Sequence, residues 1–282
     1  MSLSSCRAGF HRRLRTLARG RSMTSKLIAE IRGSAGYLVL NAPAKRNALS
    51  LDMWEAIPSL VEAHEKNPHI RALVVTGAGH EAFAAGADIT EFDDRRATDN
   101  GAKLYDAATH RATRSIARCT KPVIAAIRGI CYGGGMALAM ACDLRLASTD
   151  AKFCIPAAKL GVGYSLDGVA ALVAKLGPAL TAEILFTARS YGAQEALANG
   201  IVHALSEPAD FETLVDRYAA AIGDNAPLSI AAAKSAIAAV ISGDADDRRA
   251  AEQRVAACMA SDDYREGRAA FLEKRKPRFQ GR

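Results

Sequence analysis

The order of apolar and polar positions along the chain predicts strands and helices in alternation. Residues 27–32 and 37–40 are two short apolar runs around a small-residue turn, a pattern typical of a β-hairpin. Further strand-like runs occur at 71–76, 123–127 and 144–147. Helical periodicity separates them at about 50–66, where Ser50 or Asp52 could cap the helix, and at 102–119. This repeated alternation indicates an α/β fold.

The second half of the chain is mostly helical in pattern. We expect one short strand at 201–205 and helices at 169–174, 179–187, 193–199, 211–222, 228–241, 246–260 and 263–275. We therefore divide the chain into three parts. Residues 1–23 are a basic extension outside the fold, residues 24–222 an α/β core, and residues 223–282 a C-terminal helical region.

The positive charge of the chain is concentrated at its N-terminal end. The formal net charge is +7, but seven of the 37 basic residues and none of the 30 acidic ones lie within residues 1–26. The remainder is neutral, so we expect no nucleic-acid partner, and RNA binding through the arginine arm is disfavoured. The composition of this arm is typical of an organellar transit peptide. Alternatively, Met23 is the initiator, and this interpretation is favoured because the pattern of strands and helices begins only at Lys26. We expect a cytoplasmic protein, or a mitochondrial matrix protein if the arm is a transit peptide.

Two other classes of protein are not expected. No apolar run approaches the roughly 18 residues that a membrane span needs, so we expect no membrane association. The six cysteines form no C-x-x-C pair and lie mostly in apolar stretches. They indicate buried reduced thiols and no metal site.

Two loops of small residues predict the chemistry. They read Phe83-Ala84-Ala85-Gly86-Ala87-Asp88 and Tyr132-Gly133-Gly134-Gly135-Met136-Ala137, and the second leads into a helix-like stretch at 137–142. Glycine and alanine leave backbone N–H groups open to a ligand. Two such groups, one at a helix N-terminus, can stabilise negative charge that develops on an oxygen. The loops therefore predict an oxyanion hole, with no carboxylate in or just after the triglycine.

Two further glycine motifs have plainer interpretations. Residues 77–82 match the G-x-G-x-x-A pattern of dinucleotide sites, but no helix begins there, so we interpret them as a tight turn after a strand. Residues 163–168 read G-x-S-x-x-G, one residue longer than a nucleophile elbow. Ser165 is therefore interpreted as a helix cap. His80 and His110 lie nearest the small-residue loops and are assigned to the surface or the core.

With Cys142-Asp143-Leu144-Arg145 and the segments at 186–189, 195–197 and 271–275, the two loops closely resemble the enoyl-CoA hydratase/isomerase (crotonase) superfamily from about residue 23 to the end. The resemblance implies a crotonase-like spiral of ββα units with a C-terminal helical trimerisation region, in a homotrimer or a dimer of trimers. It implies an acyl-CoA thioester substrate, with coenzyme A as part of that substrate and no separate cofactor. It also implies that the N–H groups of Ala87 and Gly134 bind the thioester oxygen as it becomes an enolate. One such donor is typically worth ~10²–10³ in rate.

The same resemblance implies a coenzyme A site built from several segments. Residues 42–47 and 87–90 would form its walls, and Lys45 or Arg46 would lie against the adenine or pair with phosphate. Phe271 and Lys274 match residues that reach the adenine and phosphate end, often from a neighbouring subunit. The full substrate-binding set is Ala42, Lys45, Arg46, Ala85, Asp88, Ile89, Thr90, Gly133, Phe271 and Lys274.

The chain departs from the hydratases of this family at two positions. Those enzymes use two glutamates as acid and base, at the positions of Ala137 and Ala157 in this chain. Alanine cannot transfer a proton, and general acid–base help contributes ~10²–10⁴ for each group. We therefore do not expect a standard hydratase.

Tyr164 and Asp167 are the candidate replacements. Residues 161–168 are similar to the methylmalonyl-CoA decarboxylase branch, which shares the tyrosine but has His where Ala87 stands. Loss of CO₂ creates an enolate without a base, and Tyr164 could orient the carboxylate or deliver a proton. Asp167 could be a base if desolvated, or else a capping or salt-bridging carboxylate. We predict an acyl-CoA lyase or isomerase. The alternatives are a divergent hydratase that uses Asp167 and Tyr164, and a non-catalytic acyl-CoA-binding protein.

Overall fold

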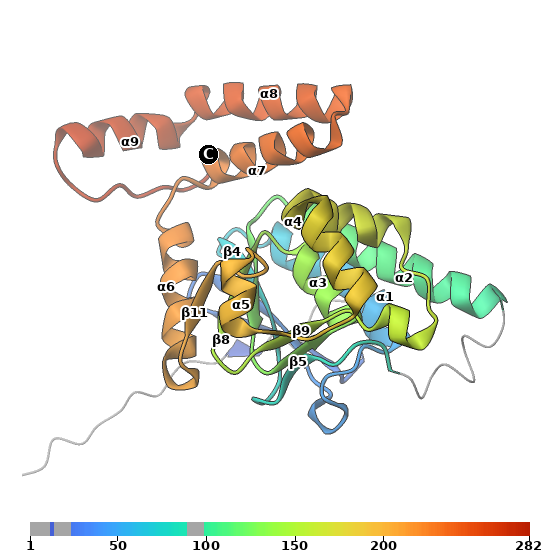
Figure 1. Cartoon of the computed structure of the whole chain (residues 1–282). Coiled ribbons are helices and arrows are strands. Elements are labelled where there is room, and N and C mark those ends of the chain that lie inside the picture. The colour runs from blue at the N-terminus through green and yellow to red at the C-terminus, as the bar shows by residue number, and fades with distance from the viewer. Residues whose placement is uncertain (1–11, 14–23, 89–98) are drawn as a thin grey trace, which may run out of the picture.

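Two β-sheets and the helices around them make up the structure (Figure 1). The computed structural model describes residues 12–13, 24–88 and 99–282. Ile89 and Thr90, which the resemblance places in the coenzyme A site, therefore lie outside the described residues.

The larger sheet has the strand order β1-β2-β3-β4-β6-β8-β11. The predicted hairpin is confirmed, because β2 and β3 pair antiparallel from Leu27 and Leu40 onward. Every pairing from β3 to β11 is parallel, which requires crossover connections and explains the alternation of strands and helices. We expected all of residues 1–23 to lie outside the fold, but Arg12 and Arg13 pair with β2. The strands are β1 Arg12–Arg13, β2 Leu27–Arg32, β3 Ala35–Leu40, β4 Ala72–Gly77, β6 Val123–Ile127, β8 Leu144–Ser148 and β11 Ala204–Ser206.

A smaller sheet, in the order β10-β9-β7-β5, was not predicted from the sequence. Its strands have two or three residues each, too few to show a periodic pattern. They are β5 Ala82–Ala84, β7 Ile130–Tyr132, β9 Lys152–Cys154 and β10 Tyr191–Gly192. Strands β5, β7 and β9 run parallel, so the segments that follow them leave the sheet at the same edge. Both small-residue loops are among these segments.

The α-helices of the described residues follow the predicted pattern, with ends that differ by up to about three residues. Helix α3 begins at Gly134, three residues earlier than predicted. The two helices predicted between 169 and 187 form one element, α4, bent at Gly177, whose φ is +76°. Ser50 occupies the N-cap of α1, but its hydroxyl donates to Asp52 and makes no capping bond. The helices are α1 Leu51–Lys66, α2 Asp99–Arg118, α3 Gly134–Ala141, α4 Leu166–Thr187, α5 Ala193–Ala198, α6 Phe211–Gly223, α7 Pro227–Ser242, α8 Ala245–Ala260 and α9 Asp262–Leu272.

The larger sheet is covered on both faces, as its apolar strands require. On β4, Leu73 and Val75 belong to one core with residues of α1, α2 and α3. Val74, which points the opposite way, belongs to a second core with residues of α6. Four of the five described cysteines are buried, and burial raises the pKa of the Cys131 and Cys142 thiols, so these thiols stay protonated.

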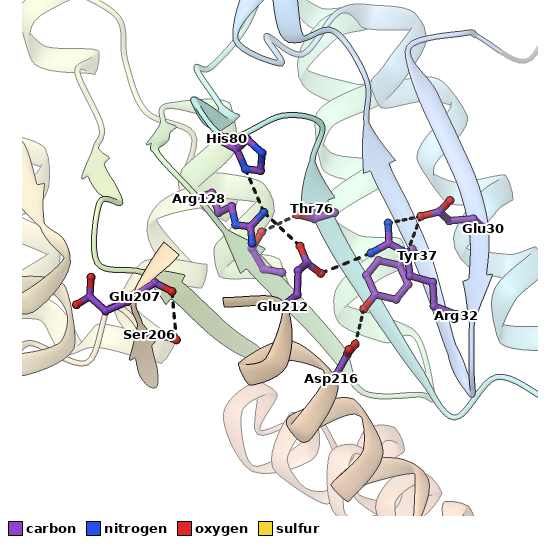
Figure 2. Close-up of polar contacts among 11 residues, drawn as sticks. Glu30, Arg32, Tyr37, Thr76, His80, Arg128, Ser206, Glu207, Glu212 and Asp216 are labelled. Atoms are coloured by element: carbon purple, nitrogen blue, oxygen red, sulfur yellow. Dashed lines mark hydrogen bonds and ion pairs between the residues drawn. The ribbon is translucent and has the colours of Figure 1, made fainter. Parts of the chain in front are cut away.

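Charged residues fasten α6 to the sheet on the face opposite α1 to α3. Figure 2 shows Glu212 of α6 between two guanidinium groups, at 3.6 Å from Arg32 and 3.3 Å from Arg128. The Tyr37 hydroxyl lies 3.5 Å from the Asp216 carboxylate of the same helix. His80, near the surface, lies 3.2 Å from Arg128. These contacts fix α6 to the sheet.

Two helical regions leave apolar surface uncovered in the chain. Helix α4 has the length and hydropathy of a membrane span, with a mean hydropathy of 1.7, which the sequence pattern did not lead us to expect. Among the other described helices, α6 and α7 pass the same test only as a pair bent by 102°. Helices α7 and α8 lie side by side and α9 continues from the end of α8, apart from the two sheets (Figure 1).

Candidate active site

The N–H group of Ala87 is held in place by the main chain of Leu49. The two residues form a parallel β-bridge. The Leu49 N–H donates to the Gly86 carbonyl at 2.7 Å, and the Leu49 carbonyl accepts from the Asp88 N–H at 3.0 Å. In such a bridge the N–H of Ala87 itself points away from Leu49. It makes no hydrogen bond to the described residues, so it is a fixed and unused donor.

The second donor, the N–H of Gly134, belongs to the first residue of α3. Gly133, with a φ of +48°, turns the chain from β7 into this helix, and its own N–H donates to the Cys154 carbonyl at 2.9 Å. The first N–H groups of a helix have no partner within it, and the helix dipole adds positive potential there. The early start of α3 thus places the triglycine at a helix N-terminus.

The two donor loops lie against each other. A methyl group added to Gly134 would lie 3.6 Å from the carbonyl carbon of Gly86, the atom bonded to the Ala87 nitrogen. A methyl group added to Gly135 would approach the Ala84 carbonyl oxygen to 2.5 Å. Helix α3 and β5 can therefore pack this closely only with glycine at 135. This packing brings the two predicted donors side by side.

Ala137 and Ala157 flank the donor loops and supply no titratable group. Ala137 lies in the first turn of α3, where its N–H donates to the Gly133 carbonyl at 3.1 Å. Ala157 directly follows Pro156, whose Cδ would lie 4.0 Å from a methyl group added to Gly133. Both alanines are partly exposed. Neither position can give or take a proton at the donors.

Tyr164 packs its ring against the main core, near Cys131 of β7. A methyl group added to Gly168 would lie 2.7 Å from its Cε1. Burial raises the pKa of Tyr164 to about 12, and the nearby Cys131 thiol of β7 adds a smaller effect in the same direction. The phenol is therefore protonated at neutral pH. Within the described ranges its hydroxyl has no hydrogen-bond partner, so it is available to a ligand.

Asp167 does not have the desolvated environment that a base there would need. Its side chain is 73% exposed in the chain, and its carboxylate lies 3.2 Å from His110 Nε2 of α2. The structure thus contains the plainer alternative, a salt-bridging carboxylate. Ser165 caps α4, as predicted, since its hydroxyl accepts from the Gly168 N–H at 3.2 Å.

The loop at 42–47 is fixed by the side chain of Asn47. This side chain is fully buried, accepts from the Ala42 N–H at 3.0 Å, and donates to the carbonyls of Ala78 and Ala82 at 2.9 and 2.7 Å. Asn47 therefore joins the expected coenzyme A wall to the turn at 77–82. No helix begins in that turn, as predicted.

The predicted ligands Lys45 and Arg46 lie next to the Ala87 loop. Lys45 Nζ is 2.7 Å from the carboxylate of Asp88, whose side chain is only 6% exposed. The Arg46 carbonyl accepts from the Ala85 N–H at 3.0 Å, and its guanidinium lies 3.9 Å from Glu81. The Lys45 and Arg46 side chains are at least half exposed, so a ligand can reach them.

Phe271 and Lys274 are not brought to this site within one chain. Phe271 is 84% exposed near the end of α9, and Lys274 follows with a φ of +54°. Helix α9 continues from the end of α8, apart from the sheets (Figure 1). A role for either residue at a coenzyme A site needs a second copy of the chain.

Sequence reasoning missed the residues that support the donors. Leu49 acts through its main chain, which no residue type reveals. Trp54 and Tyr105, buried beneath the loops, look like ordinary apolar positions of helices. His110 was noted for its position but not as a partner of Asp167.

Comparisons with known proteins agree with this geometry. A sequence model described as enoyl-CoA hydratase/isomerase matches residues 30–282. The chain is 32% identical to the short-chain-enoyl-CoA hydratase of Clostridium acetobutylicum, over 89% of this chain and 96% of that protein. It is 34% identical to the crotonyl-CoA hydratase of Syntrophomonas wolfei, over 90% and 97%.

Solved structures show the same architecture. An enoyl-CoA hydratase/carnithine racemase from Magnetospirillum magneticum superposes with a TM-score of 0.86 at 35% identity, over 92% of this chain and 97% of that one. The enoyl-CoA hydratase of Bacillus anthracis gives a TM-score of 0.86 at 28% identity, over 92% and 100%. The crotonase-like α/β fold predicted from the sequence is confirmed. The chain belongs to the enoyl-CoA hydratase/isomerase family and is an acyl-CoA enzyme of that family.

Proposed function

We propose that the enzyme stabilises a thioester enolate between the N–H groups of Ala87 and Gly134 and works as a lyase or isomerase. The observation that supports this proposal most directly is the pairing of two unused main-chain donors with alanine at 137 and 157. Such donors act on developing negative charge in a water-poor site, where they are worth more than in water. Hydration, in contrast, needs groups that activate water and protonate carbon.

Decarboxylation of a malonyl-type CoA thioester fits these residues best. The bond between Cα and the carboxylate carbon breaks and CO₂ leaves. The electron pair of the broken bond stays on Cα and forms the enolate held by Ala87 and Gly134. A proton then adds to Cα, and the thioester carbonyl is restored. Tyr164, protonated at neutral pH because its pKa is raised, can donate a hydrogen bond to the carboxylate or the proton to Cα.

Isomerisation is the second reaction of the proposed class. It requires one group that removes a proton from the substrate and returns it at another carbon. Asp167, paired with His110, is the carboxylate that the sequence offers for this task, although it is exposed within one chain. The relatives named as hydratases also keep divergent hydration open as an alternative, with Asp167 and Tyr164 in place of the glutamates. Binding of an acyl-CoA without turnover is the remaining alternative.

A panel of substrates tests the proposal. The purified enzyme is incubated with 2-enoyl-CoA, 3-enoyl-CoA and malonyl-type CoA thioesters, and the products are separated by mass. We expect CO₂ release from a malonyl-type thioester or movement of the double bond in an enoyl-CoA. Formation of the 3-hydroxyacyl product at typical hydratase rates would reject the proposal. Binding of all three without turnover would support the non-catalytic alternative instead.

Two variants assign the side chains. Tyr164→Phe should lower decarboxylation sharply, by a factor within the ~10²–10⁴ typical of a proton-transferring group. Asp167→Asn should leave decarboxylation unchanged and impair isomerisation. If both variants keep the best activity of the parent enzyme, the assignment of Tyr164 and Asp167 is wrong.

We also propose that the enzyme acts in the cytoplasm as a homotrimer or a dimer of trimers. A cavity of about 380 Å³ between α7 and α8 is lined by alanines, by Val240, Val255 and Met259, and by the charged Arg248 and Glu252. Val240, Val255 and Met259 are more than half exposed in one chain, as an interface between copies requires. Light scattering coupled to size exclusion gives the mass, and a monomer at micromolar concentration would contradict this proposal.

A further inference from the structure

A buried tryptophan contacts one half of the donor pair directly. Trp54, the only tryptophan of the chain, lies on α1 with no exposed surface. A methyl group added to Gly134 would lie 3.3 Å from its Cζ2, so the indole packs against the Gly134 peptide. Its Nε1–H donates a hydrogen bond of 2.8 Å to the hydroxyl of Tyr105.

Tyr105 connects Trp54 to the loop that carries the other donor, the N–H of Ala87. Its hydroxyl donates to the Leu49 carbonyl at 3.1 Å, and the side chain is 6% exposed on α2. The same carbonyl accepts the Asp88 N–H at 3.0 Å, while the Leu49 N–H donates to the Gly86 carbonyl at 2.7 Å. The peptides on both sides of Ala87 are thus tied to Leu49, and Leu49 is tied to Tyr105.

Building on the proposed function, we propose that Trp54 and Tyr105 are positioning residues of the oxyanion hole. The chain of hydrogen bonds from Trp54 Nε1 through the Tyr105 hydroxyl to the Leu49 carbonyl sets the direction of the Ala87 N–H. The indole ring at the same time supports the Gly134 N–H. One side chain therefore fixes both donors relative to each other, without acting on the substrate.

Packing alone does not account for these polar groups. Phenylalanine would fill the same apolar space as Tyr105, whereas the indole N–H of Trp54 donates to the Tyr105 hydroxyl and this hydroxyl donates to the buried Leu49 carbonyl. A buried network in which every member is paired restricts the chain to one arrangement. Donor geometry needs this restriction, because a displacement of about 1 Å can cost ~10²-fold in rate.

The Tyr105→Phe variant tests the proposal by a spectroscopic readout. Butyryl-CoA labelled with ¹³C at the thioester carbonyl is bound to each protein, and isotope-edited infrared difference spectra give the carbonyl stretching frequency. Donors that polarise the carbonyl lower this frequency. We expect a clear lowering in the parent enzyme, a smaller one in Tyr105→Phe, and nearly equal Kd values for butyryl-CoA. For the best substrate, Tyr105→Phe should lower kcat by roughly tenfold and leave KM little changed. This loss is smaller than the ~10²-fold of a displacement of about 1 Å, because Leu49 still holds the loop.

Tyr37→Phe is the matched control, since it removes another buried tyrosine hydroxyl, next to Asp216 on the far side of the sheet (Figure 2). It should show the parent frequency. If Tyr105→Phe does not fold, the Trp54→Phe variant is tested in its stead, because it removes the indole N–H that donates to the Tyr105 hydroxyl. A frequency in Tyr105→Phe equal to that of the parent enzyme would overturn the positioning role alone. A parent enzyme that binds butyryl-CoA without lowering the frequency would reject the proposed oxyanion hole itself.

Discussion

The ammonium group of Lys45 lies 2.7 Å from the carboxylate of Asp88, and Asp88 directly follows the donor residue Ala87. Asp88 is nearly buried, whereas Lys45 is half exposed. The pair therefore joins the expected coenzyme A wall to the loop that carries the first donor. A ligand whose phosphate attracts Lys45 would therefore weaken the contact of Lys45 with the Asp88 carboxylate.

Lys45→Met should destabilise the protein because it leaves a buried carboxylate without its ammonium group. We expect a loss of about 1–2 kcal/mol in the free energy of unfolding, less than for a fully buried pair because Lys45 is partly solvated. Urea denaturation gives this value. Asp88→Asn added to Lys45→Met should recover most of the loss, since the charge is then gone. A double variant that is less stable than Lys45→Met would contradict this account.

Gly135→Ala should be strongly destabilising. The added methyl group would meet the Ala84 carbonyl oxygen at 2.5 Å, so α3 and β5 would have to separate. Overpacking of this kind costs typically ~1–3 kcal/mol. Gly192→Ala is the control, because nothing lies within 4 Å of its added methyl group. Equal thermal unfolding temperatures for the two variants would show that the close contact of α3 with β5 is unimportant.

Glutamate at positions 137 and 157 should create hydration. Both alanines flank the donors, and each acid or base group typically contributes ~10²–10⁴, so even a poorly placed pair should raise crotonyl-CoA hydration by about 10-fold. Product formation is followed by the loss of absorbance of the conjugated thioester. The Ala137→Gln and Ala157→Gln double variant, which has the same shape without the titrating groups, should stay at the parent rate. If the glutamine variant gains as much, proton transfer is not the cause.

His64 should make the fold sensitive to acid. It is buried in α1, and both ring nitrogens lack a hydrogen-bond partner among the described residues. Burial, the largest effect, lowers its pKa below the ordinary 6.5. As the pH falls, His64 becomes protonated in the unfolded chain before it does in the folded one. The stability that depends on neutral His64 is therefore complete above about pH 6.5 and is lost as the pH falls toward the lowered pKa.

His64→Leu should therefore flatten the dependence of unfolding free energy on pH. The difference in slope between the parent and the variant should approach ~1.4 kcal/mol per pH unit below about pH 6.5. His203, whose pKa is also lowered by burial and by Arg145, is present in both proteins and cancels in this difference. Parallel curves from urea titrations between about pH 7.5 and 5.5 would contradict a neutral buried His64.

The sequence predicted the larger elements because their residues have a local pattern. The 27–40 hairpin, β4, β6, β8 and the long helices have enough apolar positions at a fixed period to be recognised. Strands β5, β7, β9 and β10 exist because of pairing with distant segments, as Ala82 with Ile130 shows. Two or three residues cannot reveal such a pairing in advance.

The candidate site was predicted only where its residues have a local sequence signal. The small-residue loops signal exposed N–H groups, and the structure places Ala87 and Gly134 together. The support by Leu49, however, is made by main-chain atoms that any residue has. The surroundings of Asp167 were equally hidden, because its contact with His110 depends on how α2 and α4 lie in space.

The β-bridge between Leu49 and Ala87 has a consequence for how this enzyme could change over evolutionary time. The groups that would hold the thioester oxygen belong to the backbone, so among exchanges of one side chain only a change to proline deletes them. Mutations can remove or add proton-transferring side chains around an intact oxygen-binding frame. A lineage can therefore lose one reaction and acquire another while it keeps the same class of ligand.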